Sequence, residues 1–541
     1  MNAQCLPFAR IPHTTRLFTD FISASPQLQQ FYPRSPYFQQ WFQEEASQIG
    51  YEPHRRARVS SIVESQNREW NASARTMENI ARLRSGASVI VTGQQVGLFG
   101  GPLFSIFKAL SAVKLAAEAT AGGVETVPVF WLATTDHDLA EVSHVSVPGP
   151  DGTLIKLSTA SHSYPDAPVG TVMLGGEIEP VLAQALELLG DSEASGFLKE
   201  SYRPGETLGS SFARLFARVF ADWGVILLDA SDPELHAIAK PMYAAAIEHA
   251  AELDEALLER GKQLDSAGYH QQVKVTSATT LLFALQQGAR TSIHRRGNGT
   301  ASNGLDFTIA EEKISRDELL SRIAASPEQF SANVLLRPVV QDYLLPTLAY
   351  TGGAAEVAYF AQVGVVYEKL LGRITPILPR VSATLVESKV QRILEKYRLE
   401  VSDAFQSPEK FEQIVAARKL PGELQLAFDQ GKEALDKALS QISEKLAALD
   451  QTLLEAAKHA SSKIQHQFEQ LRSRAARAEA LQSEVIRRHA SFLTNTLYPH
   501  NTLQEREVGA IYFLSRYGQD LLRQLYEAMH TDCHDHQLIQ L

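Results

Sequence analysis

Three consecutive titratable residues, Asp136, His137 and Asp138, follow the apolar run 127–133 and are suited to acid–base chemistry. Histidine titrates near neutrality, so His137 is the natural base of the three, while the carboxylates could bind an ammonium group or orient a ribose hydroxyl. The structural alternative is that Asp138 caps the following helix and His137 packs against Trp131. We predict that Asp136, His137 and Asp138 are catalytic.

A glycine-rich segment follows another apolar run, 88–92, and could bind an anion. Glycine permits positive φ and a close approach of backbone to ligand. Pro102 suits the first position of a helix, whose free N–H groups and positive dipole end favour a nucleotide phosphate. Neither common phosphate-binding pattern is present, so an ordinary turn is the alternative. The residues predicted to bind nucleotide or substrate here are Gly93, Gln94, Gln95, Gly97, Gly100, Gly101 and Lys108.

A third candidate binding element is the pair Gly352-Gly353, which enters a predicted helix. Glu356 and Tyr359 lie three residues apart and share one face of that helix, which suits recognition of an adenosine or an amino acid. The alternative is a tight turn before an amphipathic helix with an exposed Glu356. Polar residues flanked by apolar ones complete the predicted binding set, either as structural ion pairs or as phosphate contacts: Arg337, Gln341 and Arg380.

Alternating strands and helices must position these residues. A predicted helix over 102–119 joins the runs 88–92 and 127–133, and such a βαβ unit is right-handed, so both strands end at the same edge of the sheet. Ligands of open α/β sheets bind at that edge. A further helix is predicted over 233–250. Other strand-like runs lie at 224–229, 273–276 and 334–340, and together they indicate a doubly wound α/β core.

Two inserted stretches interrupt this core. Residues 145–205 are rich in Gly, Pro and Ser and are predicted to form a small strand-bearing excursion. The second insert, near 290–330, begins with a hairpin-like piece over 290–308 that has glycine and asparagine at its tips.

The composition changes from about residue 382 to helix-forming residues. Leucine and isoleucine between 435 and 453 alternate steps of four and three, as in a coiled-coil seam. A single helix over 432–490 would be roughly 90 Å long and would need a partner, either another subunit or the helices near 384–418. Dimerisation through the seam and an internal helical hairpin are the two alternatives. A final helix over 507–530 is predicted to pack back on the core.

Composition restricts the class of protein. The net charge of −11 over 541 residues argues against a dedicated nucleic-acid binder. Only Cys5 and Cys533 occur, so we expect no disulfide framework and a reducing cytoplasm as the setting. The chain has no run of about 18 apolar residues, so we expect no membrane span.

The glycine-rich segment after 88–92 and the triplet Asp136-His137-Asp138 together resemble motifs of the family of bacillithiol-biosynthesis cysteine-adding enzymes. Further matching segments are 333–342, 345–359, Pro379-Arg380 and 503–506. The resemblance covers nearly the whole chain. It implies a Rossmann-type α/β core over 1–381 that is related to class I aminoacyl-tRNA synthetases, an α-helical coiled coil over 382–497, and a segment over 498–541 that packs back on the core.

The resemblance also implies a reaction. Such an enzyme is a ligase that adds cysteine to glucosaminyl-malate in the last step of bacillithiol biosynthesis. ATP would activate the cysteine carboxylate, with Mg²⁺ as a further candidate cofactor and no structural metal, and a homodimer would form through the coiled coil. The histidine and lysine signatures of the synthetases are absent from this sequence.

Two other classes compete with this interpretation. A metal-dependent phosphohydrolase would use the ligand types at Asp136, His137, Asp138, Glu141 and His144. A non-catalytic nucleotide-binding scaffold would use only the coiled coil and keep the α/β domain as a relic.

Overall fold

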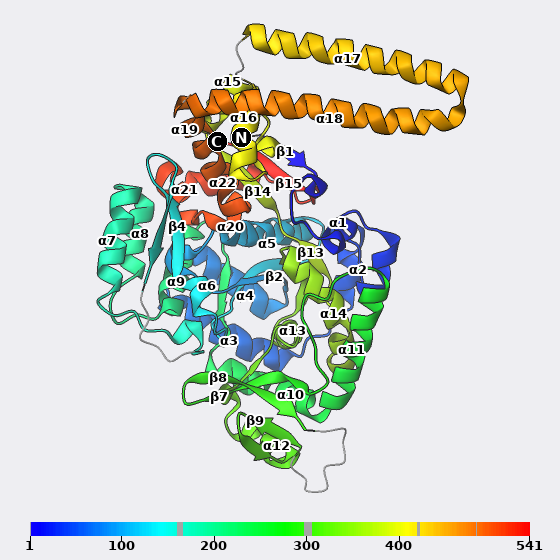
Figure 1. Ribbon diagram of the computed structural model, residues 1–541. Coiled ribbons are helices and arrows are strands. Elements are labelled where there is room, and N and C mark those ends of the chain that lie inside the picture. Colours follow the sequence, from blue (N-terminus) through cyan, green and yellow to red (C-terminus); the bar gives the residue numbers. More distant parts are fainter. Residues whose placement is uncertain (1, 160–165, 297–305, 419–421, 483) are drawn as a thin grey trace.

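A parallel five-stranded sheet organises the N-terminal domain of the computed structural model (Figure 1), which describes residues 2–159, 166–296, 306–418, 422–482 and 484–541. The strand order is β13-β12-β2-β3-β6. Chain order reverses between β2 and β12, which makes that position the topological switch point where open α/β sheets bind ligands. The strands are β2 Ser88–Gln94, β3 Thr126–Leu132, β6 Ile226–Asp229, β12 Thr347–Gly352 and β13 Ile377–Pro379.

Helices cover both faces of this sheet, and β3 shows why its sequence is apolar throughout. Val127 and Val129 pack into one core with α10 and α14, whereas Phe130 and Leu132 pack into the other with α5 and α9. A strand buried on both faces has no polar alternation. The helices around the sheet are α3 Pro53–Glu69, α4 Ala74–Ser85, α5 Phe104–Ala121, α9 Leu208–Val219, α10 Pro233–Glu248, α11 Ala250–Ser266 and α14 Ala354–Leu370.

Two predicted strands are wrong. Residues 273–276 form no strand and precede β7. The run 334–340 leads into helix α13, Arg337–Leu344, with Pro338 in its first turn. A short apolar run cannot distinguish a buried helix from a strand, and here the proline marks a helix start.

The inserts contain more structure than predicted. The first holds an antiparallel pair, β4 His144–Pro148 and β5 Leu154–Ser158, followed by α7 Ile178–Leu189 and α8 Glu193–Ser201. In the second insert, β8 and β9 pair antiparallel, as the predicted hairpin over 290–308 requires. The predicted turn residues of that hairpin, within 297–305, lie outside the described residues. Its sheet, of order β10-β9-β8-β7-β11, comprises β7 Thr279–Gln286, β8 Ala289–Arg295, β9 Phe307–Ile309, β10 Glu312–Ile314 and β11 Phe330–Ala332, with α12 Arg316–Ala325 beside it.

The coiled-coil region is a helical hairpin that projects from the body as a long arm (Figure 1). Helices α17, Gly422–Leu449, and α18, Gln451–Gln482, break at Asp450, so no single helix spans 432–490. Lys432 pairs with Glu469 at 3.0 Å, and Gln465 donates to Asp436, which fixes an antiparallel register. The neighbouring helices are α15 Ser388–Tyr397, α16 Pro408–Ala417 and α19 Glu484–Leu497.

The predicted final helix is three shorter ones, which break near Gly509 and Gly518. Their apolar residues, among them Phe513 and Leu522, join the core on the α5 side of the sheet, as predicted. They are α20 Gln504–Glu507, α21 Ala510–Tyr517 and α22 Asp520–Ala528.

Both chain ends meet in a small sheet of order β1-β15-β14. Strand β1, Ala3–Leu6, pairs antiparallel with β15, His536–Gln540, and β15 runs parallel to β14, Ser382–Val386. This pairing brings Cys5 and Cys533 together in a disulfide, which corrects the expectation that they stay unpaired. Positions 528 residues apart in the chain gave no local signal of contact.

No helix among the described residues is both long and apolar enough to cross a membrane.

Candidate active site

A pocket of about 270 Å³ lies where β2, β3 and β12 end, at the switch point of the sheet. This volume is near the lower end of small-molecule sites, which span about 300–1,000 Å³. Of the residues predicted from sequence, those that line it are Gly93, Gln94, Gln95, Lys108, Asp136, Arg337, Gln341, Gly353, Glu356, Tyr359 and Arg380.

A buried ion pair forms part of the pocket wall. Lys108 Nζ lies 2.7 Å from Glu356 Oε2 and also donates to Gly93 O at 2.7 Å. Glu356 accepts further hydrogen bonds from Gly353 N and the Tyr350 hydroxyl. Burial raises the pKa of Glu356, but Lys108 and these donors outweigh it and hold the pKa below its ordinary value. The pair therefore joins α5 to α14 across the switch point.

Arg380 forms a structural ion pair. The sequence had left this role open beside a phosphate contact. It binds Glu505 of α20 through two nitrogens, at 3.0 and 2.7 Å, and both side chains are buried. Ser382 donates to the same carboxylate at 2.9 Å. The C-terminal segment thus fixes the side of the pocket that Arg380 lines.

His137 lies beside the pocket rather than on its wall, and an arginine from the second insert holds it. Arg290 Nη1 is 3.2 Å from His137 Nδ1. A guanidinium only donates, so Nδ1 must be the acceptor and the proton sits on Nε2. Burial lowers the pKa of Arg290 to about 10, which leaves it charged at neutral pH. Asp136 Oδ1 also lies 3.6 Å from His137 Nδ1, so this nitrogen faces its neighbours Arg290 and Asp136 and not the pocket.

Asp138 takes the structural role that was the alternative to catalysis. Its side chain caps α6, Leu139–Val142, by accepting from Glu141 N at 3.1 Å. His137 packs near Phe283, at a ring separation of 6.0 Å, rather than against Trp131. Of the predicted catalytic triplet, only Asp136 lines the pocket.

Glu141, which the sequence suggested only as a possible metal ligand, supplies a further pocket carboxylate beside Asp136 and Glu356. Burial raises its pKa, and the charges of Asp138 and Asp136 raise it further. A carboxyl group with a raised pKa is closer to the range in which general bases work. The signal in the sequence was the position of Glu141 one helical turn after the acidic triplet.

The glycine turn between β2 and α5 does not reach the pocket. Gly97, Gly100 and Gly101 are buried, and a Cβ on Gly97 would lie 2.9 Å from Gly101 Cα. Gly100 and Gly101 have positive φ, but Gly97 has φ −73°. These three glycines shape the turn and do not line the pocket.

The residues just before α5 contact the C-terminal segment. The helix begins at Phe104, two residues later than predicted, and Leu103 N donates to Val508 O at 2.8 Å. Pro102 forms a bridge to Gly509 of the C-terminal segment. Gly352, the last residue of β12, accepts from Arg380 N through its carbonyl and does not line the pocket.

Sequence reasoning missed several other pocket residues: Phe104, Trp131, Tyr350 and Arg506. Arg506 is exposed and lines the pocket, and its guanidinium makes no hydrogen bond or ion pair with the described residues. Its guanidinium lies 6.0 Å from the ring of Phe104. It is therefore a cation that remains available to a ligand.

Three buried nitrogens of the pocket residues have no hydrogen-bond partner in the described part of the chain. They are Trp131 Nε1, Gln341 Nε2 and Arg380 Nε. Burying an unpaired donor costs about 1–3 kcal/mol, so such groups call for an acceptor. A ligand with carboxylate, phosphate or hydroxyl oxygens would supply it.

Within the described residues, no group of three or more His, Cys, Asp and Glu side chains is arranged to hold a metal ion. Asp138 caps a helix, and His144 Nδ1 contacts Ala140 O at 2.9 Å. The side chains that suggested a phosphohydrolase do not converge, so the structure does not favour that alternative.

Comparison with known families decides between these interpretations. Residues 1–381 match the model of the N-terminal Rossmann-like domain of bacillithiol biosynthesis BshC, and residues 383–541 match that of its C-terminal coiled-coil domain. The chain belongs to the BshC family. Its sheet order and helical arm are the Rossmann-like and coiled-coil parts that these two models describe.

Relatives in this family match the chain over its full length. A protein of Koribacter versatilis is 48% identical over 541 residues, and one of Solibacter usitatus is 36% identical over 540 residues, each with 100% of both chains covered. A protein of Salinibacter ruber is 33% identical and covers 97% of this chain. All three carry the name "Putative cysteine ligase BshC".

Proposed function

We propose that the protein is a ligase that joins the carboxyl group of cysteine to the amine of glucosaminyl-malate in the last step of bacillithiol biosynthesis. Full-length identity of 48% to a relative named as a cysteine ligase carries this proposal. The pocket supports it because it is small, polar and charged with both signs, as an amino acid requires.

Besides Glu356, which pairs with Lys108, the pocket has two carboxylates whose different surroundings suit different tasks. Asp136 lies 3.8 Å from nitrogens of both Arg290 and Arg337, and its carboxylate would bind the ammonium of cysteine. Glu141, whose pKa is raised, would take the proton that the attacking amine loses when the amide forms. The buried nitrogens of Trp131 and Gln341 would donate to substrate oxygens.

A carboxylate does not react with an amine at neutral pH, so the proposal includes ATP. When bound, ATP would supply the activation of the cysteine carboxylate. The buried glycine turn does not fit its phosphates, whereas Arg337 and Arg506 line the pocket and do. Mg²⁺ would accompany the phosphates and help to neutralise their charge.

The finer parts of the family resemblance also belong to this proposal. A relation of the core to class I aminoacyl-tRNA synthetases is supported by the parallel sheet and by the pocket at its switch point. A cytoplasmic setting would supply cysteine in its reduced form.

The reaction can be tested with purified protein. Cysteine, glucosaminyl-malate and ATP with Mg²⁺ are mixed, and mass spectrometry detects the amide product and the nucleotide released. Product with AMP or ADP in equal amount supports the proposal. Cysteine binding without product, under conditions where the fold is intact, would contradict it.

A further inference from the structure

The disulfide between Cys5 and Cys533 lies in a second cavity, at the sheet where the two chain ends meet. This cavity has a volume of about 720 Å³ and is lined by both cysteines together with His530, Asp532 and His534. Cys5 is exposed and Cys533 is half-buried. A small molecule can therefore reach the sulfur atoms without unfolding of the protein.

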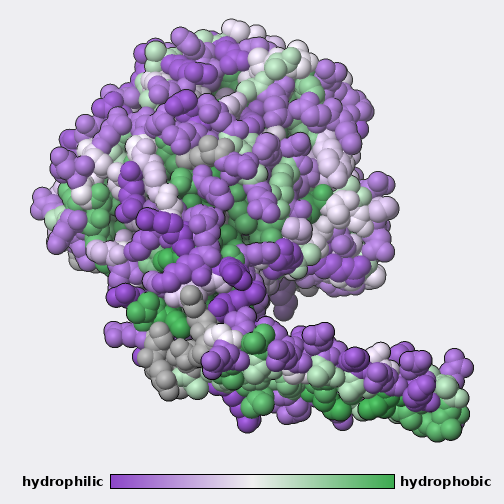
Figure 2. Space-filling view, turned by 90° about the horizontal axis from the view of Figure 1, so that it is seen from above, coloured by the Kyte–Doolittle hydropathy of each residue, from purple (hydrophilic) through white to green (hydrophobic). Residues whose placement is uncertain are grey.

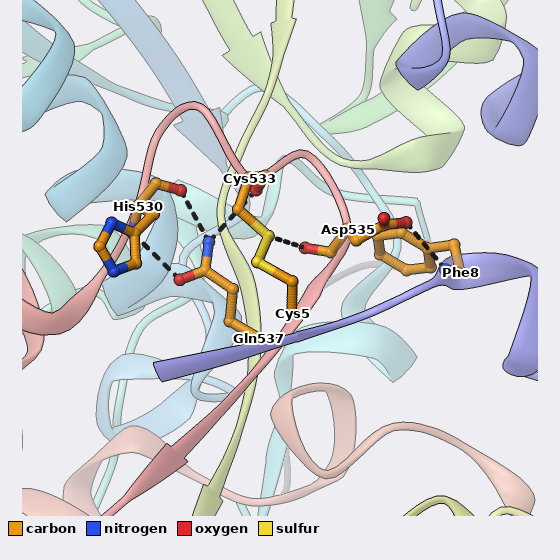
Figure 3. Close-up of a disulfide and its surroundings, with 6 residues drawn as sticks. All are labelled: Cys5, Phe8, His530, Cys533, Asp535 and Gln537. Carbon is orange, nitrogen blue, oxygen red and sulfur yellow. Dashed lines mark hydrogen bonds between the residues drawn. A yellow bond between two sulfur atoms is a disulfide. The ribbon is translucent and has the colours of Figure 1, made fainter. Parts of the chain in front are cut away.

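Contacts other than the disulfide already hold both cysteines in place (Figure 3). The buried Gln537 donates to His530 O at 2.7 Å and to Cys533 O at 3.2 Å, and it accepts from His530 N at 3.0 Å. These bonds fix the loop that carries Cys533.

The strand that carries Cys5 is fixed independently. Cys5 is opposite Gln537 in the antiparallel pairing of β1 with β15. Asp535 accepts from Phe8 N at 2.9 Å, which anchors the chain just after β1. Because hydrogen bonds keep the two cysteines adjacent, the disulfide could open and close again within the folded protein.

We propose that Cys5 and Cys533 form a site of reversible thiol–disulfide exchange with low-molecular-weight thiols. In the cytoplasm expected for this protein, disulfides that do occur are mostly transient or redox-sensing. An accessible pair held in a solvent-open cavity fits that class and not the class of buried structural disulfides.

The exchange runs in two balanced steps. The sulfur of a thiolate attacks Sγ of the exposed Cys5, a mixed disulfide forms, and the bond to Cys533 breaks. Cys533 leaves as a thiolate and takes a proton from water; its Sγ lies 3.9 Å from Asp535 O, which could accept from the resulting thiol. A second thiolate then attacks the sulfur of the bound small molecule and releases Cys5. Two thiols have been oxidised to a disulfide, and the protein disulfide has been reduced.

The product of the proposed ligation is itself a thiol of this class. The identity of this product rests on the proposed function, whereas the proposal of an exchange site at Cys5 and Cys533 does not. The test below counts thiols with glutathione as the probe, so its outcome is independent of whether the protein ligates cysteine.

Intact-protein mass spectrometry after alkylation tests the proposal. Native wild-type protein should pass from no free thiol to two per chain when excess reduced glutathione is added, with a transient adduct on Cys5. The Cys533→Ser variant should keep a stable adduct on Cys5 when treated with glutathione disulfide. Circular dichroism should be unchanged throughout.

Two results would overturn the proposal. One is a disulfide that glutathione reduces only after the protein has been unfolded, which would make it a structural staple. The other is a native protein that keeps two free thiols in glutathione disulfide, with neither a disulfide nor an adduct.

Discussion

At the scale of single residues, partners from distant segments decide which side chains are free to act. His137 looked like the base of the site, but Arg290 donates to its Nδ1 across 153 residues of sequence. Arg380 is similarly held by Glu505. Glu141 and the exposed Arg506 remain available in the pocket, whereas Asp136 already lies near Arg290 and Arg337.

The role assigned to Glu141 predicts a large loss of activity. Glu141→Gln should lower the rate of cysteine ligation by about 100-fold, because the glutamine side chain cannot take a proton from the amine. A loss of this size is typical when a general acid or base is removed. Glu255→Gln, at an exposed position of α11, is the matched control and should leave the rate unchanged. Steady-state kinetics on both variants checks this. Equal losses in the two variants would contradict the role of Glu141.

The buried carboxylates predict a loss of stability in acid. The pKa values of Glu356 and Glu505 in the folded protein lie below the ordinary value of 4.5. Their stabilisation is therefore complete above pH 4.5 and is lost as the pH falls through the lowered values. The free energy of unfolding, measured with urea at a series of pH values from above 4.5 downwards, should decline as the pH falls.

Glu356→Gln should reduce that decline and should also destabilise the protein by about 3–5 kcal/mol, because Lys108 would stay buried without its partner. Glu255→Gln, at an exposed position of α11, is the control and should leave the urea midpoint unchanged. A Glu356→Gln variant as stable as the wild type would show that the ion pair is dispensable.

At the scale of elements, the sequence predicted the strands of the core better than the turn that follows them. The runs 88–92 and 127–133 are strands because their residues are buried on both faces of the sheet. The run 334–340 is equally apolar but belongs mostly to a helix, and periodicity could not reveal this. The glycine turn suggested an anion site although neither common phosphate-binding pattern is present, and its backbone is buried against α9 and the C-terminal segment.

The turn therefore predicts a stability effect rather than a binding effect. Gly97→Ala would bring a Cβ within 2.9 Å of Gly101 Cα and should destabilise the protein by about 1–3 kcal/mol, with activity per folded molecule retained. Gly196→Ala in α8, where nothing lies within 4 Å, should instead stabilise slightly. Thermal unfolding and kinetics separate the two effects. A stable Gly97→Ala protein that fails to bind nucleotide would restore the phosphate role.

At the scale of the whole molecule, the arm has apolar residues that its own hairpin does not cover. Leu449, Leu471 and Ile442 are 77%, 57% and 55% exposed. Figure 2 shows apolar surface along the arm. By contrast, Leu439 and Leu446 are partly buried within the hairpin. The seam predicted from the sequence is thus divided, because Leu439 and Leu446 pack within the hairpin while Ile442 and Leu449 of the same seam are exposed. The exposed residues are the candidates for a second subunit.

We predict a homodimer that forms through these exposed residues, each of which would contribute about 1.5–3 kcal/mol when buried. Ile442→Lys with Leu471→Lys should give a monomer in light scattering, with helix content unchanged. Gln441→Lys, a charge at an exposed polar position, should remain dimeric. A wild-type monomer at micromolar concentration would contradict the prediction.

Contacts between distant segments were beyond sequence reasoning for a common physical reason. The pairing of Cys5 with Cys533 and of Arg380 with Glu505 depends on how β14 and β15 come together. No local sequence pattern around any of these residues indicates which distant residue it contacts. The pocket itself was predictable, because carboxyl ends of neighbouring parallel strands must meet at one edge.

The central claim, that this pocket joins cysteine to its amine acceptor, is tested most directly by the thiol profile of cells that lack the protein. Extracts should lose one low-molecular-weight thiol and accumulate its cysteine-free precursor. Wild-type protein should restore the thiol, and Glu141→Gln at equal abundance should not. An unchanged thiol profile, or full restoration by Glu141→Gln, would contradict the account.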